Sequence, residues 1–168
     1  MLGMFNKCYV LKEIKGINNF NISNVEHMDA MFQQCYGLKH LDLFNFNTSN
    51  VITMIHMFVN MLNLEELNIS NFITLNVTDM KAMFGARKKL KFLDLSNFNT
   101  LNVTNMQWMF NTCNELKEIK GLTNFNTAKV HSMKGMFEEC DTLEKLDLTS
   151  FDTHNVIDYK VFFLIVMN

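Results

Sequence analysis

Several features are scarce or missing in the sequence, and each excludes a class of protein. Four cysteines in 168 residues are too few for a disulfide-dense scaffold. The formal net charge of −2 lacks the basic excess that is typical of nucleic-acid-binding proteins. The apolar run at 161–167 has seven residues, whereas a membrane-spanning helix needs about twenty. The N-terminal MLGMFNKCYV lacks a basic segment followed by a long apolar stretch, so we expect no secretory signal peptide.

Proline is also absent, whereas asparagine occurs 23 times and hydrophobic residues make up 48% of the chain. The hydrophobic content and the length allow one sizeable core. Asparagine is unfavourable inside helices and strands, so its abundance requires a structural role elsewhere.

Met-Phe pairs recur along the chain at nearly constant spacing. They begin at Met4, Met31, Met57, Met83, Met109 and Met136, and a truncated seventh copy begins at Phe162. The spacing of 26 or 27 residues is typical of solenoids, in which each repeat forms one turn of a continuous coil. We therefore predict a single solenoid of six repeats over residues 1–168, in the α/β class.

Two periodicities follow one another within each repeat. The run Leu41-Asp42-Leu43 alternates apolar and polar residues, so equivalent strands of stacked repeats would form a parallel sheet. We expect a spine of aromatic rings from Phe20, Phe46, Phe72, Phe98, Phe125 and Phe151. The residues that follow have the spacing of one helix face: Val51, Met54, Met57, Phe58 and Met61. The predicted fold has a parallel sheet on one face and short helices on the other, and 3₁₀ turns are the alternative for part of the helical face.

Asparagine recurs at three positions of the repeat. We expect one set to cap the predicted helices: Asn24, Asn50, Asn76, Asn102 and Asn155. We expect the sets beside the spine to bridge backbone groups of neighbouring coils: Asn19, Asn45, Asn71, Asn97 and Asn124 before the phenylalanine, and Asn21, Asn47, Asn99 and Asn126 after it. Gly16 and Gly121 accompany one additional residue in their copies and predict a bulge or a wider turn.

Residues 90–109, LKFLDLSNFNTLNVTNMQWM, resemble the consensus of the BspA-like leucine-rich-repeat surface-protein family, and the resemblance extends from Met4 to about Phe163. It implies a leucine-rich-repeat solenoid for adhesion or protein recognition, with no catalytic residues. It also implies a location at the cell surface; a cytoplasmic location is the alternative, because no signal peptide is visible.

The cysteines share one position of the repeat. Adjacent coils would bring Cys8 near Cys35 and Cys113 near Cys140, so disulfides are conceivable, but small buried apolar side chains are the favoured interpretation. No cysteine or histidine spacing is typical of a metal site, and we expect no cofactor. Since no histidine has a matching nucleophile motif, we predict that the protein is not an enzyme.

Two further features have structural interpretations. The basic cluster at 87–91, with Arg87 at its start, is expected to be a solvated loop; a patch that binds an anionic ligand is the alternative. Trp108 stands where other copies have mostly small residues, and it either covers a gap between helices or is exposed.

The outer face of the predicted sheet is the candidate binding site. Its positions vary while the core positions stay constant, which is typical of a recognition scaffold; variation without any constraint is the alternative. The candidate residues are Glu13, His40, Asp42, Phe44, Glu66, Asn68, Phe92, Asp94, Glu118 and Asp147. Their mixed charge favours a protein or glycan partner over nucleic acid.

The leading hypothesis is therefore a non-catalytic protein- or glycan-binding module at a cell surface. An intracellular interaction scaffold and a structural fragment of a longer repeat array are the alternatives. The apolar run from Tyr159 to Met167 either caps the last coil or promotes self-association.

Overall fold

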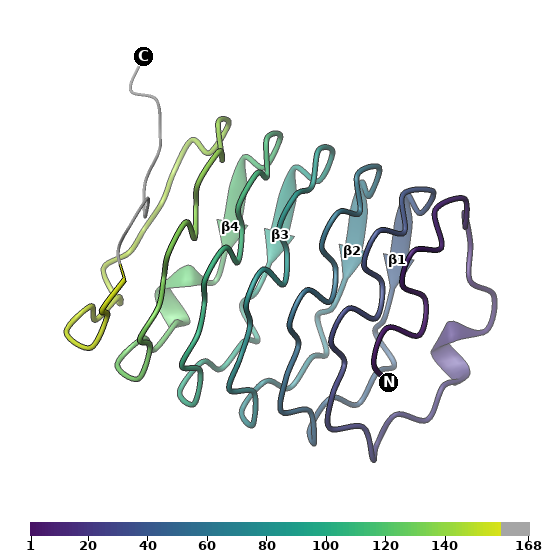
Figure 1. Cartoon of the computed structure of the whole chain (residues 1–168), viewed down its shortest axis with the longest axis horizontal. Coiled ribbons are helices and arrows are strands. Elements are labelled where there is room, and N and C mark those ends of the chain that lie inside the picture. The colour runs from purple at the N-terminus through teal and green to yellow at the C-terminus, as the bar shows by residue number, and fades with distance from the viewer. Residues whose placement is uncertain (159–168) are drawn as a thin grey trace.

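The structure, a computed structural model, describes residues 1–158. The chain winds into successive coils that lie side by side along one axis (Figure 1). Regular elements are short: strands β1 (His40–Asp42), β2 (Glu66–Asn68), β3 (Phe92–Asp94) and β4 (Glu118–Lys120), and the 3₁₀ helices η1 (Ile17–Asn19) and η2 (Leu122–Asn124). The predicted seventh copy from Phe162 and the apolar run Tyr159–Met167 lie outside the described residues.

The strands pair in parallel with strands of the neighbouring coil, and in residues 1–158 they form two separate two-stranded sheets instead of the one sheet that the sequence predicts. β1 pairs with β2 and β3 with β4, which places His40 beside Glu66 and Phe92 beside Glu118. Because the partners are 26 residues apart, equivalent residues of successive repeats lie next to each other. A second line of single parallel bridges follows another side of the coils through His27, Thr53, Asp79, Asn105, Ser132 and Asp158.

The predicted helices are wrong: no α-helix occurs in residues 1–158. The backbone N–H groups of Ala30, Phe32 and Gln34 donate to carbonyls of the next coil instead of closing helical turns. Two residues of every coil also have a left-handed φ of 48–63°. They are Gly3, Ala30, His56, Ala82, Trp108 and Gly135, and, four positions later, Lys7, Gln34, Asn60, Ala86, Thr112 and Glu139. Successive tight turns thus bury the same apolar residues that a helix would bury.

The interior contains stacked rings and methionines. The continuous ring stack runs through the Met-Phe phenylalanines, with centroids of successive rings 5.4–5.8 Å apart: Phe5, Phe32, Phe58, Phe84, Phe110 and Phe137. The predicted spine lies elsewhere; its members Phe46, Phe72, Phe98 and Phe125 are buried, but they form no such continuous stack.

Residues 1–158 contain no helix that is long and apolar enough to cross a membrane.

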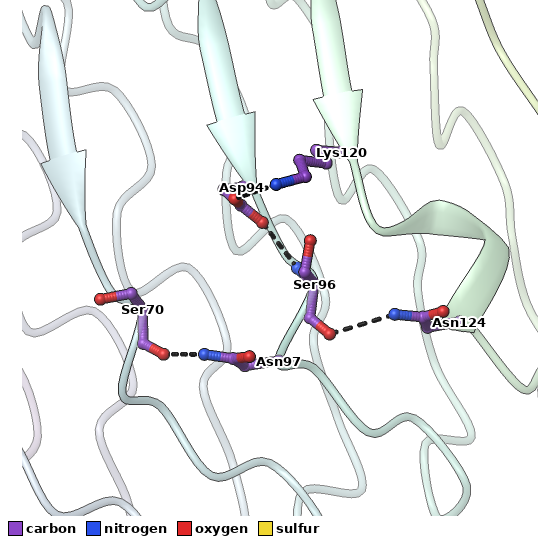
Figure 2. Close-up of polar contacts among 6 residues, drawn as sticks. All are labelled: Ser70, Asp94, Ser96, Asn97, Lys120 and Asn124. Carbon is purple, nitrogen blue, oxygen red and sulfur yellow. Dashed lines mark hydrogen bonds and ion pairs between the residues drawn. The ribbon is translucent and has the colours of Figure 1, made fainter.

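Asparagine amides bridge neighbouring coils, although not all at the predicted positions. The predicted helix caps donate instead to carbonyls of the preceding coil at 2.7–2.9 Å: Asn50, Asn76, Asn102 and Asn155. Asn97 and Asn124 bridge as predicted, to the carbonyls of Ser70 and Ser96 (Figure 2). The set after the spine accepts from the N–H two residues onward and closes local turns: Asn21, Asn47, Asn99 and Asn126.

Buried threonines join the coils beside these turns. The hydroxyls of Thr48, Thr74, Thr100 and Thr127 each donate to a carbonyl of the next coil at 2.8–3.0 Å. Each also accepts from the N–H of the same residue at 2.7–2.8 Å. The side chain thereby satisfies two backbone groups that have no ladder partner.

Candidate binding surface

Phe92 is the most exposed aromatic residue of the sheet face. It begins β3 and exposes 63% of its surface. Shallow depressions of about 480 and 330 Å³ lie on either side of it. Lysines and glutamates line them: Glu65, Glu66, Lys89, Lys91 and Glu115 on one side, and Lys117, Glu118, Glu144 and Lys145 on the other. We call this surface the Phe92 row.

The predicted residues Glu13, His40, Glu66 and Glu118 are exposed, as expected for an outer face. The His40 Nδ1 atom lies 3.1 Å from Glu66 Oε2, and Glu13 lies 3.9 Å from Lys15. Lys117 and Glu144 form another exposed pair at 3.5 Å. Exposed pairs of this kind contribute little to stability, so their charges are available to a partner.

Four predicted site residues close turns at the ends of strands or equivalent segments. Each accepts a hydrogen bond from the N–H two residues onward at 2.9–3.2 Å: Asp42, Asn68, Asp94 and Asp147. Hydrogen bonds from the hydroxyl and the N–H of Ser96 hold the pKa of Asp94 below its usual value. Figure 2 shows the bond from the N–H. Bonds from Thr149 lower the pKa of Asp147 in the same way.

The remaining two copies make this turn differently. Lys15 and Lys120 occupy the equivalent position, and the next residues, Gly16 and Gly121, have φ of 76° and 91° and begin 3₁₀ turns. In copies where the side chain closes the turn, this position therefore holds an aspartate or an asparagine. In copies where the following glycine forms the turn, it holds a lysine. The variation at this position, interpreted from the sequence as recognition, has a structural cause.

Phe44 does not lie in the Phe92 row. It follows β1 and lines an open groove of about 650 Å³ on three neighbouring coils. The other lining residues are Asn45, Phe46, Asn47, Ser70, Asn71, Phe72, Ile73, Thr74, Leu75, Asn97 and Asn99. We call this the Phe44 groove. Phe44, Ile73 and Leu75 expose 47%, 48% and 45% of their surfaces.

Ile73 is a candidate residue that the sequence analysis missed. It occupies the position at which Asn47 and Asn99 close local turns in the neighbouring copies. The isoleucine gives up this hydrogen bond, and about half of its surface remains exposed. The signal was visible in the sequence as the gap in the asparagine series Asn21, Asn47, Asn99 and Asn126.

The cysteines are free thiols. Cys35, Cys113 and Cys140 are buried and donate to carbonyls of Phe5, Phe84 and Phe110 at 3.1–3.2 Å. Burial raises the pKa of Cys35 to about 11. The interaction between the other two thiols lowers the pKa of Cys113 and raises that of Cys140.

The basic cluster is only partly solvated. Lys88, Lys89 and Lys91 are exposed, but Arg87 is buried at 1% exposure, so the prediction of a solvated loop is wrong for this residue. Trp108 is partly buried; Lys81 and Lys134 lie over its ring at 5.2 and 5.6 Å. No group of three or more histidine, cysteine or acidic side chains in residues 1–158 is arranged to hold a metal ion.

The coils and their surfaces define a repeat protein with an exposed phenylalanine among charged side chains and a neutral groove. The chain belongs to the DUF285 family: the family model, described as Mycoplasma protein of unknown function, matches residues 1–92 and again residues 86–166. The double match agrees with an internally repeated chain. No curated protein and no solved structure matches it.

Proposed function

We propose that the chain is a non-catalytic binding module of the BspA-like leucine-rich-repeat type and that it recognises a protein partner through the Phe92 row. The single observation that carries the proposal is the exposure of Phe92 between two depressions lined by charged side chains. Interface hot spots are enriched in aromatic residues that a partner desolvates, surrounded by a polar rim. The row has that arrangement before a partner binds.

The charge of the row specifies what kind of partner fits. Lysines and glutamates both line each depression, so the surface carries no field of a single sign. Such a surface suits a protein with its own mixed charges, because opposite charges can be matched locally. A polyanion would meet Glu66, Glu115 and Glu118 as well as the lysines.

The proposal is tested by replacing Phe92 with serine. The intact chain, Phe92→Ser and a control, Val10→Ser, would be immobilised and exposed to labelled cell-surface proteins. Val10 is 87% exposed and lies in the first coil, outside the Phe92 row. We expect a defined set of proteins to bind the wild type and Val10→Ser and to bind Phe92→Ser about tenfold less. Equal capture by Phe92→Ser would remove the row from consideration.

We further propose that the protein acts at the cell surface, on the basis of the resemblance to BspA-like proteins. Brief protease treatment of intact cells, followed by detection of the chain, tests the location. Loss of the chain while a cytoplasmic marker survives supports the proposal. Full protection of the chain in intact cells, with digestion after lysis, would favour an intracellular scaffold.

A further inference from the structure

We propose that the Phe44 groove is a second binding site and that it takes a neutral glycan. The groove lies beyond the ends of β1 and β2, away from the depressions beside Phe92. Its three contributing coils carry equivalent positions side by side, so an asparagine recurs along the groove at Asn45, Asn71 and Asn97.

The groove contains no ionisable side chain among its twelve lining residues. A charged ligand that entered it would lose hydration without gaining an opposite charge. The depressions beside Phe92, by contrast, are lined by lysines and glutamates. Complementarity of charge therefore favours an uncharged ligand in the Phe44 groove.

Two amides in the groove are available to a ligand. Asn97 and Asn124 donate to the carbonyls of the preceding coil (Figure 2). The equivalent side chains of Asn45 and Asn71 are exposed and form no hydrogen bond within residues 1–158. A carboxamide both donates and accepts, as a sugar hydroxyl does, so the pair can bind adjacent hydroxyls in either direction. Parallel coils lie about 4.8 Å apart, which repeats the amide along the groove.

Apolar surface lies beside these amides. Phe44 presents a half-exposed ring, and Ile73 and Leu75 are exposed to a similar extent. The negative face of an aromatic ring attracts polarised C–H groups, which line one face of a sugar ring. Ile73 also lacks the turn-closing amide of the neighbouring copies, and positions that break a local rule are typical of functional or strained sites.

The composition of the groove argues for a glycan over a helical peptide. Seven of the twelve lining residues are Asn, Ser or Thr: Asn45, Asn47, Ser70, Asn71, Thr74, Asn97 and Asn99. An amphipathic helix docks into a groove that is continuously apolar. A lining that alternates amides with apolar side chains matches the alternation of hydroxyls and C–H faces on an oligosaccharide.

Side chains of the groove can be replaced by residues that stand at the equivalent positions of other copies, so the backbone of the coils should tolerate the changes. Phe44→Ser introduces the residue of Ser70 and Ser96, Ile73→Asn that of Asn47, and Leu75→Ser that of Ser49. In Ile73→Asn the backbone bonds of residue 73 to Thr48 are retained, and a turn-closing amide is gained. Leu101→Ser is the matched control, since Leu101 is 44% exposed and does not line the groove.

The test is binding of the fluorescently labelled full chain to an array of neutral, sialylated and sulfated oligosaccharides, with an uncharged Ser/Asn/Leu peptide on the same surface. Circular dichroism and thermal unfolding check that each variant is folded. Asn71→Asp keeps the size of the side chain and adds a charge, so it tests the groove even if one of the larger substitutions unfolds the chain. We expect the wild type and Leu101→Ser to bind at least one neutral oligosaccharide. Phe44→Ser, Ile73→Asn, Leu75→Ser and Asn71→Asp should each bind about tenfold more weakly.

Four results would overturn the proposal. They are the absence of binding to every neutral oligosaccharide, preference for the sialylated or sulfated series, preference for the peptide, and undiminished binding by the folded groove variants. Phe92→Ser measured against protein partners reports on the proposed function separately, because neither experiment uses the other's ligand.

Discussion

The guanidinium of Arg87 lies 5.0 Å from the ring centre of Phe84, and none of its nitrogen atoms has a hydrogen-bond partner. The ring of Phe58 lies 5.3 Å away on the neighbouring coil. Arg87 is buried at the position that Cys35 and Met61 occupy in other copies. Contact with two rings offsets part of the lost hydration, on the order of 2 kcal/mol when desolvated, but a buried charge without a counter-ion remains destabilising.

We therefore predict that Arg87→Met stabilises the protein. Methionine is already accommodated at this position as Met61, and replacing buried ions by apolar residues has stabilised other proteins by about 1–4 kcal/mol. Urea unfolding at pH 7 measures the free energy of unfolding. Lys88→Met, a change of the same kind at an exposed neighbour, is the control and should shift it by less than about 0.5 kcal/mol. A loss of stability in Arg87→Met would contradict the prediction.

The same residue predicts a dependence on pH. Burial lowers the pKa of Arg87 from its ordinary value to about 10. Between these values the unfolded chain binds the proton that the folded chain releases, so the contribution of Arg87 to the free energy of unfolding rises with pH. The advantage of Arg87→Met over the wild type should therefore be largest below pH 10 and narrow above it. An advantage that stays constant up to pH 11 would show that Arg87 remains charged when folded.

Two glycines provide a matched pair for the turns at the sheet ends. Gly16 and Gly121 both have left-handed backbone conformations, but a Cβ at Gly121 would lie 2.5 Å from the backbone nitrogen of Ser96. A Cβ at Gly16 would meet only Asn19 Nδ2, at 3.7 Å. We expect Gly16→Ala to destabilise by about 1 kcal/mol, the cost of the left-handed region, and Gly121→Ala by about 3 kcal/mol or more, because backbone must also move. Chemical denaturation measures the free energy of unfolding of both variants. An equal decrease in the two would argue against the close approach at Gly121.

We expect substitution of a buried threonine to lower the free energy of unfolding by more than the small size of the side chain suggests. Thr100→Val keeps the shape of the side chain but removes its bonds to the N–H and carbonyl of Asn126, at 2.8 and 2.9 Å. Because a buried backbone group without a partner costs about 1–3 kcal/mol, we expect the free energy of unfolding to fall by an amount in that range or above it. The exposed Thr123 makes no side-chain hydrogen bond in the described part of the chain, so Thr123→Val should be nearly neutral. Comparable losses in the two variants would contradict this role.

The strands and the buried positions could be predicted because their signals are local and repeated. The alternation around Leu41 places one apolar residue inward, and the 26-residue spacing places it beside its equivalent in the next coil. The tight turns of the Met-Phe segments could not be predicted in this way. Ala30, His56 and Trp108 have left-handed conformations without being glycine, so the sequence shows only an apolar spacing that helices and successive turns share.

The candidate surface was predicted only in part, for a different reason. Variation between repeats is typical of a recognition surface, but at Asp42 and Asp94 it follows the way each turn is closed. Phe92 remains on the sheet face, whereas Phe44 lies in a groove that only the packing of three coils creates. Ile73 could have been identified, because it interrupts an otherwise regular asparagine position.

His56 provides a final prediction, on stability at mildly acidic pH. It is partly buried at a left-handed φ of 56°, and burial lowers its pKa, with a further decrease from the charge of Lys81 that Asp79 and Asp29 oppose. Below its ordinary value of 6.5 the unfolded chain therefore binds more protons at this residue than the folded chain, so the free energy of unfolding falls as the pH is lowered through that value.

His56→Asn removes the titrating group and introduces a residue that tolerates the left-handed region, as Asn60 does in the same coil. We expect thermal unfolding of His56→Asn to be less sensitive than that of the wild type between pH 8 and pH 5, and its midpoint at pH 8 to be at least as high. His154→Asn, at an exposed histidine, controls for the loss of one imidazole. An equal acid sensitivity in His56→Asn and the wild type would assign the loss of stability at low pH to groups other than His56. The two chains share every carboxylate and every other histidine.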